Sequence, residues 1–196
     1  MIVVDVEGTG VDCRKHSLVS VGAVSLHDPS LRFYEECQIW EGAQVSEGAL
    51  TVNGFTEAEI TDKNKQTEKA LILSFLHWSQ HFTDRTLAGQ NVSYDRDMLK
   101  AAAERAGLSC DLAYRTIDTH TLCWMHMVKA GIAPPVDVER HRSALNLDAI
   151  LQYCGIPEEP KPHNALTGAL CHGEVISRLL YNRPFFPEFL DYKIPW

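Results

Sequence analysis

The sequence lacks the features that would assign it to a membrane, secreted or fibrous class of protein. No apolar run approaches the length of a membrane span, and the N-terminus has no basic region followed by an apolar stretch and a cleavage site. No low-complexity tract or internal repeat interrupts the 196 residues. These absences predict a cytoplasmic protein without a membrane partner, and the length fits a single domain over residues 1–196.

Paired cysteines and excess positive charge are also missing. The six cysteines are scattered and form no C-x-x-C pair, which predicts reduced thiols rather than a disulfide or zinc framework. The net charge is -8, which argues against a protein that holds long duplexes on a broad basic face. An enzyme that grips only a short nucleic-acid end can still be acidic, because metal ions can supply positive charge at its site.

The hydrophobic pattern predicts strands first and then helices that alternate with short strands. Strands are expected at 1–7, 18–27, 31–40 and 86–91. Helices are expected within 51–60 and at 67–82, 93–107, 116–131, 143–155 and 164–181. This order predicts an α/β fold with a mixed sheet.

Polar and proline residues predict a loop before the helix at 143–155. The segment 132–142 is expected to be a mobile loop. Ser143 is expected to be the N-cap of the helix that follows, and Gly155 its C-cap.

Two carboxylates stand one residue apart on the first predicted strand. The two-residue period of a strand places Asp5 and Glu7 on one face, where both can reach a single hard cation such as Mg²⁺. Burial of either charge without a partner would be costly. The alternative is a strand end at which both carboxylates are solvated, and the pair alone does not decide between these interpretations.

Three further segments follow in a fixed order: "GTG" after the carboxylates, "GQNVSYDRDML" in the middle, and "HNALTGA" at the last helix. In this order the chain resembles the DEDD superfamily of 3′-to-5′ exonucleases, in the histidine-bearing branch that includes proofreading exonuclease subunits, RNase T and oligoribonuclease. The resemblance covers nearly the whole chain and implies a ribonuclease H-like fold, with a mixed sheet and flanking helices, forming a single exonuclease domain. The matching positions are Asp5, Glu7, Thr9, Gly10, Asn91, Tyr94, Asp95, His163 and Ala165.

The resemblance implies a site for two Mg²⁺ or Mn²⁺ ions that clamp the scissile phosphate. Asp5 would bridge both ions, Glu7 would complete the site of the water-activating ion, and Asp95 would hold the second ion. His163 would be the general base that deprotonates the attacking water. The alternative for Asp95 is a favourable charge at a helix N-terminus.

The resemblance also implies how substrate would bind. Thr9 and Gly10 would place backbone N–H groups against the terminal nucleotide, and Asn91 is a further substrate-binding position, with a turn or cap residue as its alternative. The partner would be a single-stranded DNA or RNA 3′ end or a short oligonucleotide, and no pattern distinguishes DNA from RNA. The C-terminal segment 183–196 either packs on its own domain or forms part of a homodimer contact.

The third motif departs from the family at its last position, where Gly168 stands in place of an acid. The loss should weaken the ion that activates water, so the chain would be weakly active or inactive, and Gly168→Asp should raise activity. Glu174 is poorly spaced to replace the acid, whereas Asp118 and Asp148 stay open as replacements. The alternative function is a non-catalytic module that binds nucleic-acid 3′ ends or a protein partner.

Overall fold

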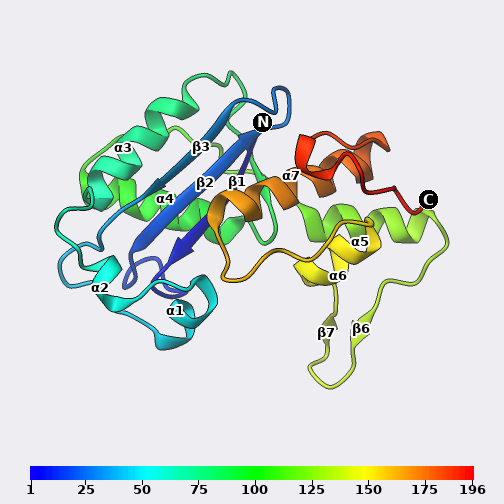
Figure 1. Cartoon of the computed structure of the whole chain (residues 1–196), viewed down its shortest axis with the longest axis horizontal. Helices are drawn as coiled ribbons and strands as arrows, with labels where there is room; N and C mark the ends of the chain where they lie inside the picture. The colour runs from blue at the N-terminus through cyan, green and yellow to red at the C-terminus, as the bar shows by residue number, and fades with distance from the viewer.

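The computed structural model describes all 196 residues and contains a five-stranded mixed sheet between two layers of helices (Figure 1). The strand order is β3-β2-β1-β4-β5, with β1 antiparallel to β2 and parallel to β4. This architecture confirms the predicted α/β, ribonuclease H-like class. The strands are β1 (Ile2–Gly8), β2 (Leu18–Ser25), β3 (Arg32–Glu36), β4 (Leu87–Gly89) and β5 (Thr116–Asp118).

Helices cover both faces of the sheet (Figure 1). The core on one face includes residues of α3 and α4, and the core on the other face includes residues of α5, α6 and α7. None of the helices combines the length and the apolar composition needed to cross a membrane. The helices are α1 (Glu47–Asn53), α2 (Glu57–Ile60), α3 (Glu68–Ser79), α4 (Ser93–Ala106), α5 (Thr119–Lys129), α6 (Leu147–Tyr153) and α7 (Ala165–Tyr181), followed by a 3-10 turn at Pro187–Phe189.

The central strand β1 contributes to both cores. Val4 and Val6 pack in the core that contains α3 and α4, whereas Val3 packs in the core that contains α7. Because side chains alternate along a strand, Asp5 and Glu7 share the face of Val3. The fold therefore directs both carboxylates toward the layer that holds α7.

The last helix begins in direct contact with the sheet. Gly22 of β2 pairs with Asp5 of β1, and a Cβ on Gly22 would lie 2.1 Å from the carbonyl carbon of Ala165. Only a residue without a side chain allows the first turn of α7 to approach the strand this closely. The close approach sets α7 beside the carboxylates of β1.

The predictions for the segment before α6 are wrong in part. Residues within 132–142 contribute to a two-stranded hairpin, β6 (Val136–Asp137) with β7 (Arg142–Ser143), which protrudes beside α6 (Figure 1). Ser143 is therefore not an N-cap, and its hydroxyl instead accepts the N–H of Leu145 at 3.2 Å. Asn146 caps α6, because its side chain accepts the N–H of Ala149 at 2.9 Å.

The C-terminal segment packs on its own chain, as one of the two sequence interpretations has it. The fully buried Arg178 forms an ion pair with Glu174 at 2.7 Å and donates to the carbonyl of Phe189 at 3.0 Å. Glu174 also accepts the backbone N–H groups of Phe185 and Phe186, at 2.9 and 3.1 Å. This buried network holds the residues after α7 against the helix.

Candidate active site

The carboxyl ends of the parallel strands β1 and β4 meet at one edge of the sheet, and three of the predicted acids gather there. Asp5 and Glu7 lie on β1, and Asp95 lies in the first turn of α4, directly after β4. Asp95 is buried, and its Oδ1 accepts the N–H of Val6 at 2.9 Å. This hydrogen bond ties the start of α4 to β1 and holds Asp95 beside the other two carboxylates.

The gathered acids disfavour one another's charges. Burial raises the pKa of Asp5 well above its ordinary value, and the charges of Asp95, Glu7 and Glu159 raise it further. Burial and then Glu159 raise the pKa of Glu7 to about 7, and burial raises that of Asp95 to about 8. No lysine or arginine forms an ion pair with any of these four acids. The cluster is therefore a strong attractor for a cation.

Position 168 faces this cluster, as the match to the third motif implies. A Cβ on Gly168 would lie 2.3 Å from Oδ2 and 2.8 Å from Cγ of Asp5. Any side chain at this position would therefore require Asp5 to rotate away from α7. Gly168 lets the helix and the Asp5 carboxylate share this space.

The loop before α7 positions the predicted base. Asn164 caps the helix, because its side chain accepts the N–H of Leu166 at 3.0 Å. The preceding side chain, His163, is about one-third exposed, and its Nδ1 lies 2.9 Å from Oε2 of Glu159. An ionised carboxylate can only accept a hydrogen bond, so Nδ1 carries the hydrogen and Nε2 is left to accept a proton.

Glu159 is the site residue that the sequence analysis missed. It is 5 % exposed, whereas its neighbour Glu158 is exposed to solvent. The acidic, proline-containing segment around it has the composition of a solvated loop. Its residues follow neither the hydrophobic periodicity of a helix nor that of a strand. The one available signal was a carboxylate four positions before His163.

The predicted substrate residues have different surroundings. Thr9 is fully buried, its N–H donates to the carbonyl of Ser17 at 2.9 Å, and its hydroxyl donates to the carbonyl of Gln44 at 2.7 Å. The N–H of Thr9 is thus already engaged within the turn. The carbonyl of the next residue, Gly10, accepts the hydroxyl of Tyr94 at 3.0 Å.

A cavity of about 530 Å³ adjoins the acid cluster. Glu7 and Gly10 line it on the side of β1, and Val52 lines it on the side of α1. Asn91 does not line this cavity: it follows β4 at the same edge of the sheet, exposed, with a left-handed φ of 51°. The structure thus places Gly10 at the cavity, Thr9 in the turn that supports it and Asn91 outside it.

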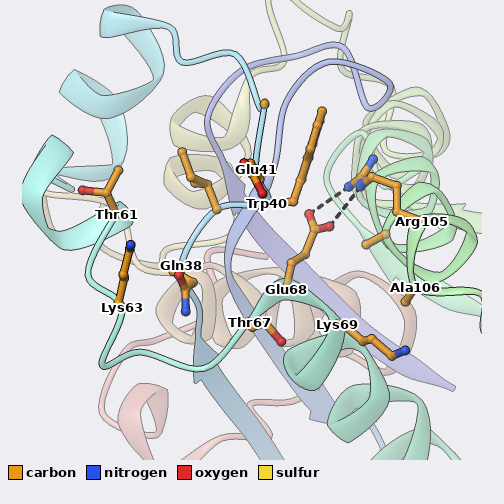
Figure 2. Close-up of a pocket in the computed structure, with 13 residues that line it drawn as sticks. Gln38, Trp40, Glu41, Thr61, Lys63, Thr67, Glu68, Lys69, Arg105 and Ala106 are labelled. Carbon is orange, nitrogen blue, oxygen red and sulfur yellow. Dashed lines mark hydrogen bonds and ion pairs between the residues drawn. The ribbon is translucent and has the colours of Figure 1, made fainter.

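A second cavity, of about 700 Å³, lies elsewhere and contains none of the predicted site residues (Figure 2). Glu68 and Arg105 point toward each other in it and form an ion pair at 2.8 Å, and the Arg105 guanidinium lies 5.3 Å from the Trp40 ring centre. The charge of Arg105 is therefore neutralised. The residues that line this cavity form no arrangement typical of a catalytic site.

The acids at the edge of the sheet fit a hard divalent cation by their chemistry, since such ions prefer carboxylate oxygens. As the side chains stand, no group of three or more histidine, cysteine or acidic residues is arranged to hold a metal ion. Asp95 already uses one oxygen on Val6, and Asp5 rests against Gly168. A shared ion therefore requires these short side chains to rotate inward.

The acids named from the sequence as replacements for position 168 have other partners or functions. Asp118 caps α5 through the N–H of His120 at 2.8 Å. Glu174 is engaged with Arg178, as described above. Asp148 is half-buried on α6, and its charge helps to raise the pKa of Glu159.

No family model matches the sequence, and no curated protein matches it. Solved structures do match, and they share a fold that is found in nucleases. The structure of E. coli exonuclease I in complex with a dT13 oligonucleotide aligns with a TM-score of 0.70 and 16% identity, over 90% of this chain and 40% of that chain. This chain thus spans about two fifths of exonuclease I.

Two other structures agree with this match. The zinc-bound E. coli exonuclease I complex with single-stranded DNA has a TM-score of 0.72 and 15% identity, over 93% of this chain and 41% of that chain. Cell-death related nuclease 4 has a TM-score of 0.69 and 11% identity, over 91% and 62% respectively. At these identities the likeness shows a nuclease-type fold.

Proposed function

We propose that this chain is a metal-dependent 3′-to-5′ exonuclease of the DEDD type, with residues 1–196 as a single exonuclease domain. The observation that carries the proposal is the acid cluster: Asp5, Glu7 and Asp95 gather at one edge of the sheet without a lysine or arginine partner. His163 lies in the loop before α7, the helix whose Gly168 contacts Asp5. A fold that is shared with exonuclease I and with cell-death related nuclease 4 supports it.

In this proposal Asp5, Glu7 and Asp95 hold two Mg²⁺ or Mn²⁺ ions. When bound, such ions neutralise the scissile phosphate and lower the pKa of the attacking water. His163 takes the proton of that water at Nε2, since Glu159 holds Nδ1. The cavity beside Gly10 receives the terminal nucleotide.

Single-stranded DNA is the substrate that the comparisons favour. Exonuclease I structures contain dT13 and dA16 oligonucleotides, and the acidic net charge of this chain disfavours long duplexes. The proposed substrates are therefore single-stranded 3′ ends and short oligonucleotides.

The test compares one single-stranded oligonucleotide labelled at its 3′ end with the same oligonucleotide labelled at its 5′ end, in Mg²⁺ or Mn²⁺. The proposal predicts immediate release of labelled mononucleotide from the 3′ end and a descending ladder from the 5′ label. Asp5→Asn should abolish both, and the chelator EDTA should do the same. Release that starts at the 5′ end would contradict the proposal.

The second candidate function is a non-catalytic module that binds 3′ ends, and the glycine at position 168 favours it. This candidate predicts that the oligonucleotide binds without hydrolysis in either metal ion. Both candidates require binding, so the hydrolysis assay separates them.

A further inference from the structure

Glu159 is a buried acid with only half of its carboxylate in use. Its side chain is 2% exposed, and Oε2 is bonded to Nδ1 of His163 at 2.9 Å. Oε1 is buried and has no hydrogen-bond partner. Burial raises the pKa of Glu159, whereas His163 and the backbone N–H of Asn164 favour its charged form. A buried carboxylate oxygen without a partner is costly, and such an atom calls for a specific explanation.

The surroundings of Glu159 are acidic. The loop that carries Glu159 borders the cavity beside Glu7, because the backbone N–H of His163 donates to the carbonyl of Val52 at 3.3 Å and Val52 lines that cavity with Glu7. After burial, the charge of Glu159 also helps to raise the pKa of Asp5 and Glu7. The charge of Asp148 adds to the negative charge around Glu159. His163 is the only side chain that forms an ion pair with Glu159. A cation held with Asp5 and Glu7 is the partner that would satisfy Oε1.

Position 168 cannot supply this negative charge, because it is a glycine in contact with the Asp5 carboxylate. The site therefore has an acid at 159 in a chain that has none at 168. A single explanation can account for the acid at position 159 and for its absence at position 168.

We propose that Glu159 replaces the acid missing at position 168 and supplies, through Oε1, the fourth carboxylate of the divalent-cation site. The inference rests on the proposed function, because it assumes that Asp5 and Glu7 hold the cation. In this inference the acid ligand stands at position 159 instead of position 168, and the glycine at 168 does not abolish activity.

The test measures Mn²⁺ affinity by isothermal titration calorimetry, without substrate. Glu159→Gln keeps the size of the side chain and an oxygen that accepts from His163, but it removes the charge. We expect its Mn²⁺ affinity to fall by about tenfold or more. Glu158→Gln, the exposed neighbour, should bind as the unchanged chain does, and circular dichroism should show that both variants are folded.

His163→Asn separates the ligand function from the positioning of the loop. If Glu159 is a ligand, this variant keeps its Mn²⁺ affinity. Equal losses in Glu159→Gln and His163→Asn would overturn the inference, because the effect would then come from the loop.

Asp5→Asn distinguishes the inference from the proposed function. Unchanged affinity in Glu159→Gln, with binding abolished in Asp5→Asn, would overturn the inference and leave the cation site in place. If the unchanged chain bound no Mn²⁺, both proposals would fail.

Discussion

Two buried glutamates near α7 have opposite surroundings. Glu174 has both oxygens occupied, by Arg178 and by two backbone N–H groups. Glu159 has one oxygen on the partly exposed His163 and one without a hydrogen-bond partner. The first arrangement stabilises the fold. The second leaves negative charge uncompensated at the edge of the sheet, which is typical of a site that binds a cation.

Removal of His163, the partner of Glu159, and removal of Arg178, the partner of Glu174, should have different effects. His163→Ala should lower turnover by about 10²- to 10⁴-fold, because a general base acts in the transition state. Mn²⁺ affinity should stay the same. Single-turnover hydrolysis checks this result, with the exposed His77→Ala as the control. Turnover within about twofold of the unchanged chain would remove His163 from the mechanism.

Arg178→Met should instead destabilise the fold, by about 3–5 kcal/mol, because it leaves the buried charge of Glu174 without its partner. Urea unfolding measures this change. The matched control is Arg183→Met, since Arg183 is exposed and its loss should change stability by about 0.5 kcal/mol or less. Equal unfolding midpoints for the two variants would contradict the structural function of the Glu174 pair.

The acid cluster predicts that the stability of the metal-free chain depends on pH. The pKa of Glu7 is raised to about 7 and that of Asp95 to about 8, whereas both are near 4 in an unfolded chain. Between these values the folded state binds more protons than the unfolded state, so stability falls as pH rises through this window.

The melting temperature measured without metal should therefore be lower at about pH 8 than at about pH 5. Mg²⁺ or Mn²⁺ should restore most of the loss at the higher pH, because an ion that binds only the folded state stabilises it. The double variant Asp5→Asn/Glu7→Gln should show a weaker pH dependence and little response to metal. A melting temperature that rises with pH would contradict the account.

Gly168→Asp should have the smallest effect. If Glu159 already supplies the fourth carboxylate, a further acid at 168 crowds Asp5, and hydrolysis should change by about threefold or less. The informative variant is Glu159→Gln/Gly168→Asp, which should regain part of the Mn²⁺ affinity that Glu159→Gln loses. A large gain in the single variant would instead support an empty fourth position.

The sequence predicted the parts of the site that lie on regular elements. The shared face of Asp5 and Glu7 follows from the period of a strand. Asp95 follows from the resemblance, since the start of a helix gave only its alternative interpretation. Glu159 follows from neither, because nothing local distinguishes it from the exposed Glu158. Its burial depends on how the loop packs between α6 and α7. The prediction of Ser143 as an N-cap was wrong for a related reason. Ser143 belongs to strand β7 of the hairpin, and Asn146 caps α6 instead.

The most direct test of the central claim is the anomalous diffraction of Mn²⁺ in a crystal of this protein. The account predicts a peak at the carboxyl edge of β1, within about 2.0–2.6 Å of oxygens from Asp5 and Glu159, and no peak near Glu174. A Mn²⁺ peak bound elsewhere, with none between Asp5 and Glu159, would contradict it.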